Sequence, residues 1–113
     1  MELEAFELVL LRRPEDATSY DDDTLERIQR EHLEFHRQMR DEGLVVTNGP
    51  VLDQPDESLR GLAFYRTGSL ERAGELAAKD PAVVAGRLAV EVMTWWCAPN
   101  TMARAGRPVT TEG

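Results

Sequence analysis

Cysteine and long apolar runs are both scarce in this sequence. Cys97 is the single cysteine of the chain, which excludes a disulfide framework and a zinc site built from several thiolates. No apolar stretch approaches the roughly 18 residues of a membrane-spanning helix. The N-terminal sequence "MELEAFELVLLRRPED" lacks the basic leader and the cleavage motif of a secretory signal. We therefore expect a cytoplasmic protein with no membrane contact.

Positive charge is also in short supply. The chain has 21 acidic and 13 basic residues, a net charge of −8. Much of the excess lies in the segment 15–23, "EDATSYDDD". Because phosphate backbones and anionic lipids repel such a chain, nucleic acid is not an expected partner.

The length of 113 residues suits one domain with one modest core. A hydrophobic content of 42% and a charged content of 30% are ordinary for a globular protein. We assign residues 1–98 to the domain and residues 99–113 to a C-terminal tail. The tail sequence has no apolar periodicity, so we expect a loose segment or an arm laid on a partner subunit.

The apolar pattern predicts six main elements. The expected helices are the Gly- and Pro-free segment 24–42 and the shorter segment 70–79. Asp23 with Glu26 is expected to cap the first helix as a capping box, and Gly43 to end it. Four segments have the composition of strands: 6–11, 44–51, 60–67 and 87–97.

The order strand, helix, strand, strand, helix, strand predicts an α+β protein with the ferredoxin-like βαββαβ fold. This fold has a four-stranded antiparallel sheet with two helices on one face. The strands carry apolar residues on both sides, and an uncovered apolar face would exceed what soluble monomers expose. We therefore expect a homodimer in which a second sheet packs on that face.

The two histidines of the chain lie four residues apart in "REHLEFHRQM", residues 30–39. His32 falls within the apolar stripe of the predicted helix, and His36 is expected nearer its edge. A buried imidazole needs a partner for at least one ring nitrogen, so a carboxylate or a carbonyl is expected beneath it. The zinc-protease pattern requires Glu directly after the first His, whereas Leu33 stands there, and no third ligand is evident. We therefore expect no metal.

Two segments together resemble the YCII-related proteins, small bacterial domains of the dimeric α+β barrel type. They are "EHLEFHRQMRDEGLVVTNGPV" (31–51) and "AFYRTGSLERAGELAAKDPAVVAGRLAVEVMTWW" (63–96), and the resemblance covers residues 5–97. The long acidic loop 14–23 and Ala82, where an aromatic residue often follows Asp-Pro, depart from the family pattern. The matching features, taken in order and spacing, are His32, Gly49-Pro50, Asp80-Pro81 and Gly86.

The resemblance implies a His–Asp pair, His32 and Asp80, as the catalytic residues. The carboxylate would hold the imidazole in one tautomer and stabilise its protonated form, as general acid/base chemistry requires. The implied reaction is lyase-like, such as dehydrochlorination, or hydrolase-like, on a small substrate for which an aromatic ring is a candidate. Such chemistry needs no cofactor.

The two catalytic candidates also have plain structural explanations. His32 could be satisfied by a backbone carbonyl, and Asp80 before Pro81 is a good helix cap without any catalysis. The alternative function is a non-catalytic, dimeric ligand-binding or accessory domain.

Other residues are candidates for binding the substrate. They are His36, Gly49, Pro50, Tyr65 and Arg12.

Overall fold

The computed structural model describes residues 1–102 and 106–110. The expected order of strands and helices is confirmed, with ends that differ by a few residues from the predicted ones. A short helix, α3, forms at the Asp-Pro corner. The elements are β1 (Glu4–Arg12), α1 (Asp22–Asp41), β2 (Val45–Pro50), β3 (Leu59–Tyr65), α2 (Leu70–Ala77), α3 (Pro81–Val84) and β4 (Ala89–Cys97).

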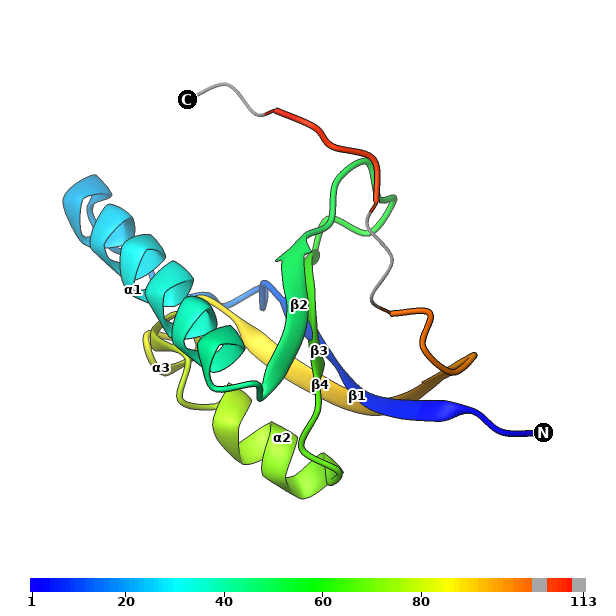
Figure 1. Ribbon diagram of the computed structural model, residues 1–113. Helices are drawn as coiled ribbons and strands as arrows, with labels where there is room; N and C mark the ends of the chain where they lie inside the picture. The colour runs from blue at the N-terminus through cyan, green and yellow to red at the C-terminus, as the bar shows by residue number, and fades with distance from the viewer. Residues whose placement is uncertain (103–105, 111–113) are drawn as a thin grey trace.

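The four strands form one antiparallel sheet in the order β2-β3-β1-β4. β1 lies between β3 and β4, so the two βαβ halves of the chain interleave. The helices all lie on one side of the sheet (Figure 1). This is the predicted ferredoxin-like α+β fold.

The sheet has two different faces. The face toward the helices supplies the core, in which Val9, Ala63 and Tyr65 are almost fully buried. We call the opposite side the open face. Cross-strand partners share a face, and the register Leu8–Phe64, Leu8–Met93 and Phe6–Trp95 places these large apolar side chains on the open one.

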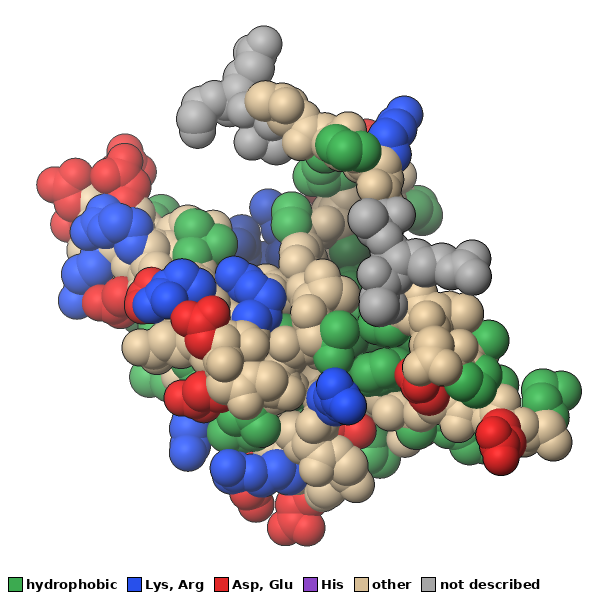
Figure 2. Space-filling view, in the orientation of Figure 1, with side chains coloured by type: hydrophobic (Ala, Val, Ile, Leu, Met, Phe, Trp, Pro, Cys, Tyr) green, Lys and Arg blue, Asp and Glu red, His purple; other side chains and the backbone are tan. Residues whose placement is uncertain are grey.

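The surface reflects this arrangement. Charged side chains of both signs cover the outer side of α1 (Figure 2). Hydrophobic side chains gather beside β2, on the side that faces away from the helices. On the open face Met93 and Trp95 are 37% and 36% exposed. The rings of Phe64 and Trp95 are in contact, with centroids 4.9 Å apart, so they form a continuous apolar surface on this face.

Local capping explains where the helices begin and end. The predicted capping box of Asp23 and Glu26 is wrong, because Asp21 is the N-cap of α1 and its carboxylate accepts from the backbone N–H of Thr24. The acidic run offers three adjacent caps, and the first of them lets the next two acids complement the helix dipole. Gly43, with φ of +77°, ends α1 as predicted.

The acidic loop between β1 and α1 is tied to the turn that follows α3. Thr18 donates its backbone N–H to the Gly86 carbonyl, and Arg87 donates to the Thr18 carbonyl, at 3.2 and 3.0 Å. The Tyr20 hydroxyl donates to the Ala85 carbonyl at 2.7 Å. These bonds hold the loop against the corner that carries Asp80.

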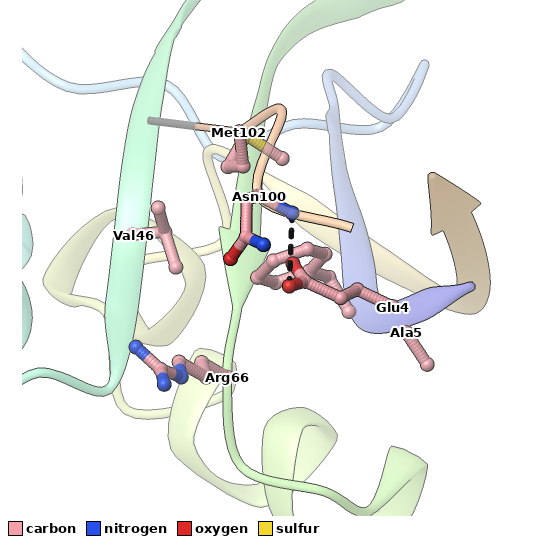
Figure 3. A pocket seen from close by; sticks show the side chains of 7 residues that line it. Glu4, Ala5, Val46, Arg66, Asn100 and Met102 are labelled. Carbon is pink, nitrogen blue, oxygen red and sulfur yellow. Dashed lines mark hydrogen bonds between the residues drawn. The ribbon is translucent and has the colours of Figure 1, made fainter. Parts of the chain in front are cut away.

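The chain after β4 turns back toward the start of β1. The backbone N–H of Asn100 donates to the Glu4 carboxylate at 3.0 Å (Figure 3). The prediction of a tail over residues 99–113 falls in part outside the described residues, at 103–105 and 111–113. Among the helices described, none has the length and apolar character needed to cross a bilayer.

Candidate functional site

A single buried carboxylate organises the candidate site. Asp80 caps α3, with one oxygen, Oδ1, accepting from the Ala82 N–H at 2.9 Å. Its other oxygen, Oδ2, faces α1. There it lies 2.7 Å from Nδ1 of His32 and 3.1 Å from Nε2 of His36. We call His32, His36 and Asp80 the Asp80 triad.

The two histidines differ in burial, in the opposite sense to the prediction. His36 is 1% exposed, whereas the side chain of His32 is 14% exposed. The buried residues of α1 are Ile28, His36 and Met39. Ile28 and Met39 belong to the predicted apolar stripe, so the difference concerns the two histidines alone. The prediction was wrong because α1 packs on α3 as well as on the sheet, and this contact draws His36 inward.

Asp80 is held as a carboxylate. Burial by itself raises the pKa of its carboxyl, but hydrogen bonds from His32 and His36 and the charge of His32 outweigh that effect. The net result lowers the pKa from 3.8 to about 2. The group therefore keeps its negative charge across the physiological range.

This low pKa predicts acid sensitivity. Because the folded-state pKa lies below the ordinary 3.8, the carboxylate stabilises the fold fully above that value and loses its contribution as the pH falls toward 2. The difference corresponds to roughly 2 kcal/mol. Urea unfolding of the wild type and of Asp80→Asn should show the stability gap between them narrowing by that amount from pH 5 to pH 2. A gap that stays constant would contradict the assignment.

His36 contacts the Asp80 carboxylate from the buried side of α1. Its Nδ1 is buried without a hydrogen-bond partner among the described residues. A proton on Nδ1 would be a buried donor with no acceptor, so the geometry favours the tautomer in which Nε2 donates to Asp80. His36 was predicted to bind substrate, yet it does not line the neighbouring cavity.

His32 is the member of the triad that reaches open space. It lines a cavity of about 280 Å³ between α1 and the ends of β2 and β3, together with Gly49 and Pro50. Three of the predicted site residues thus line the cavity, and Asp80 and His36 lie directly behind His32 in the triad. Because Nδ1 of His32 is bonded to Asp80, Nε2 is the ring nitrogen left for a ligand.

Two predicted binding residues lie elsewhere. Tyr65 faces the helices and is 1% exposed, and burial, with a further effect of the Asp80 charge, raises the pKa of its hydroxyl. Arg12 points its guanidinium away from the cavity, toward Glu91 at 2.6 Å and Asp56 at 2.8 Å. The pairing register shifts between Leu11 and Arg12, which alters how the residues at the end of β1 are directed.

Four polar residues of the cavity were missed. Arg13 adjoins Arg12, and Asn48 adjoins Gly49, two residues that were considered. Gln29 lies three residues before His32, on the same side of α1. Arg60 begins the apolar part of β3. The missed lining residues are Arg13, Gln29, Asn48 and Arg60.

The Asp80 triad also has the donor atoms of a metal site. Its three ligand atoms lie within 4.8 Å of one another, and the third ligand that the sequence did not reveal is Asp80. Two imidazoles and a carboxylate suit Zn²⁺. However, ligands of a tetrahedral zinc ion are about 3.3 Å apart, whereas His32 Nδ1 and Asp80 Oδ2 are separated by 2.7 Å, a hydrogen-bond distance. The cluster as it stands is a hydrogen-bonded triad, which would have to open to hold an ion.

A second hollow lies at the other end of the sheet. It measures about 450 Å³ and is lined by Glu4, Val46, Arg66 and Met102, among others (Figure 3). Neither histidine nor Asp80 lines it. The triad and its smaller cavity therefore remain the candidate site.

Known proteins support the fold and the family. The structure is similar to 5-chloro-2-hydroxyhydroquinone dehydrochlorinase (TftG) from Burkholderia phenoliruptrix AC1100, solved in complex with 2,5-dihydroxybenzoquinone, with a TM-score of 0.58. The likeness covers 80% of this chain and 92% of TftG at 16% sequence identity, so it shows a shared fold alone. No curated protein matches the sequence. The profile of the YCII-related domain matches residues 7–96. Because that match spans most of the chain, the protein belongs to the YCII-related domain family.

Proposed function

We propose that the protein is a small-molecule enzyme in which His32, oriented by Asp80, acts as a general acid or base. One observation carries the proposal. Nδ1 of His32 is 2.7 Å from a buried carboxylate while the same ring lines a cavity of about 280 Å³. A histidine with only a structural role has no need of an open side.

The geometry supports a separate role for each ring nitrogen. Asp80 accepts the Nδ1–H of His32, so Nε2 carries the lone pair and can take a proton from a bound molecule. The negative charge of Asp80 compensates the positive charge that then forms on the ring. The proton returns from Nε2 to the substrate or to a leaving group in a later step. Elimination and hydrolysis both need such a transfer.

The family relationship supports a lyase-like or hydrolase-like reaction. TftG, which shares the fold, is a dehydrochlorinase of a chlorinated hydroxyhydroquinone. A dehydrochlorination removes a proton and a chloride, which is work suited to a single acid/base group. For this chain the first compounds to test are therefore small hydroxylated aromatics with and without chlorine.

Loss of His32 should abolish turnover without unfolding the protein. We expect His32→Ala to lower the rate by about two to four orders of magnitude, measured as chloride release or as new products by mass spectrometry. Glu31→Ala is the matched control, because Glu31 is the exposed neighbour on the same helix. Full activity in His32→Ala would refute the role, and an unfolded variant, detected by circular dichroism, would assign His32 a structural one.

A non-catalytic ligand-binding module is the second candidate. The same cavity and pair could hold a ligand without changing it. The observation that favours it is the small number of catalytic groups. Among the described residues that line the cavity, His32 is the only ionisable acid/base residue besides two arginines. Retained ligand with no product after incubation would favour this candidate over the enzyme.

We also propose that the protein forms a homodimer through the open face. The support is the row of apolar residues at its centre, among them Leu8, Phe64 and Met93, and the resemblance, which implies paired sheets. Two copies would bury these side chains and form a dimeric α+β barrel. The cavity beside His32 lies between α1 and the ends of β2 and β3.

A further inference from the structure

The cavity beside His32 has an unusual charge for this protein. The chain carries 21 acidic residues against 13 basic ones. Yet the described residues that line the cavity include Arg13 and Arg60 and no aspartate or glutamate. A site that is positive within an acidic protein needs a physical explanation.

No carboxylate of the described residues neutralises the charge of these two arginines. Among residues 1–102 and 106–110, neither Arg13 nor Arg60 forms an ion pair, whereas Arg12 and Arg37 each pair with two carboxylates. Arg13 uses its Nε to donate to the Arg87 carbonyl at 3.1 Å, which fixes the guanidinium while leaving its terminal nitrogens available. A fixed guanidinium with available terminal nitrogens, as in Arg13, is typical of a site that binds an anion.

The cations also oppose one another. Burial lowers the pKa of the Arg13 guanidinium, and the nearby charges of Arg87 and Arg60 lower it further. The positive charges of these arginines therefore repel one another. An anion between the arginines would relieve that repulsion and would gain charge-assisted hydrogen bonds.

The neutral groups of the cavity fit the same kind of ligand. The Asn48 side-chain oxygen accepts from Arg40, so the NH₂ end of that amide remains as a donor. At Gly61 an added Cβ would lie 2.9 Å from the Gly49 carbonyl, so these strands approach too closely there for a side chain. The cavity of about 280 Å³ equals roughly nine water volumes, which suits a molecule with one ring.

We infer that this cavity binds a small molecule bearing an anionic oxygen, a carboxylate or a phenolate, which Arg13 and Arg60 hold while its reacting part faces Nε2 of His32. The inference names the ligand class of the site proposed above and rests on that proposal for the location of the site. It also replaces Arg12, the arginine selected from the sequence, with its neighbour Arg13.

Matched pairs of probes test the charge requirement. Calorimetry with benzoate and with benzamide compares a carboxylate with a neutral molecule of the same shape. A second pair, 4-nitrophenolate and 4-nitroanisole at mildly alkaline pH, tests the phenolate. We expect the anion of at least one pair to bind about tenfold or more tightly than its neutral partner, and the preference to weaken with salt. The pair that shows the larger preference identifies the anionic group.

Arginine variants test the assignment to residues. Arg60→Gln and Arg13→Gln should each weaken binding of the preferred anion by about tenfold or more, and Arg60→Lys should retain part of it. Arg12→Gln is the matched control, because Arg12 is ion-paired away from the cavity. Circular dichroism checks that each variant is folded. Equal binding of anion and neutral partner in both pairs would overturn the inference, as would an equal effect of Arg12→Gln.

The two proposals fail in different ways. Anion binding that depends on Arg60, with no turnover of any compound, would sustain this inference and refute the enzyme. Turnover that depends on His32, with no preference for anions, would sustain the enzyme and refute this inference. His32→Ala should still bind the preferred anion, because the arginines and not the imidazole hold the charge.

Discussion

Replacing Asp80 with alanine is expected to lower the free energy of unfolding by about 3–5 kcal/mol. The change removes the N-cap of α3 and leaves His36, which is 1% exposed, with no acceptor for its ring. It also removes the acceptor of His32. Buried donors without acceptors cost more than the bonds themselves contribute. Thermal unfolding should show a melting temperature lowered by roughly 10–20 °C.

Two controls separate the parts of that loss. Ser69→Ala removes the cap of α2, whose hydroxyl accepts from the Arg72 N–H, and involves no charge or histidine. It should cost about 1 kcal/mol. Asp80→Asn keeps an oxygen for the Ala82 N–H and should fall between the two. If Asp80→Ala cost no more than Ser69→Ala, the bonds to the histidines would contribute nothing to stability.

The fold followed from local patterns in the sequence. Strand segments, the long helix and the glycine stop at Gly43 are each encoded within a few neighbouring residues, so periodicity and turn chemistry predict them. The order of these elements then leaves few topologies, because crossover connections are right-handed. The sheet order and the placement of the helices were predictable for that reason.

The site was only partly predictable. His32 and Asp80 are 48 residues apart in sequence, and local patterns do not determine whether such residues meet. Their pairing was implied by the family resemblance, and the geometry agrees with it. The relative burial of the two histidines was not predictable, because the contact of α1 with α3 decides which of them is the more buried.

The positions of the arginines illustrate a second limit. Arg12 is the last residue of β1 and Arg13 follows it. Arg13 lines the cavity, whereas Arg12 is ion-paired elsewhere. The shift in register between Leu11 and Arg12 occurs at this point. Because no sequence signal marks such a shift, the arginine that lines the cavity could not be chosen from the sequence.

The open face raises a separate question of assembly. Leu8 lies at its centre, since β1 is an inner strand and Leu8 pairs with both Phe64 and Met93. In the proposed dimer, the neighbouring strands and the partner's sheet would shield the Leu8 side chain from water. A charge placed there would lose its hydration without gaining a partner. In a monomer the same charge would remain partly hydrated.

Leu8→Glu is therefore expected to convert the dimer to a monomer and to leave the fold intact. Sedimentation velocity should find twice the 12.7 kDa chain mass for the wild type and the single chain mass for the variant. Val84→Glu is the matched control, because Val84 is 73% exposed on α3 and lies on the helix side. It introduces the same charge and should remain dimeric. A wild type that sediments as a single chain, or a Leu8→Glu variant that stays dimeric, would rule out pairing through this face.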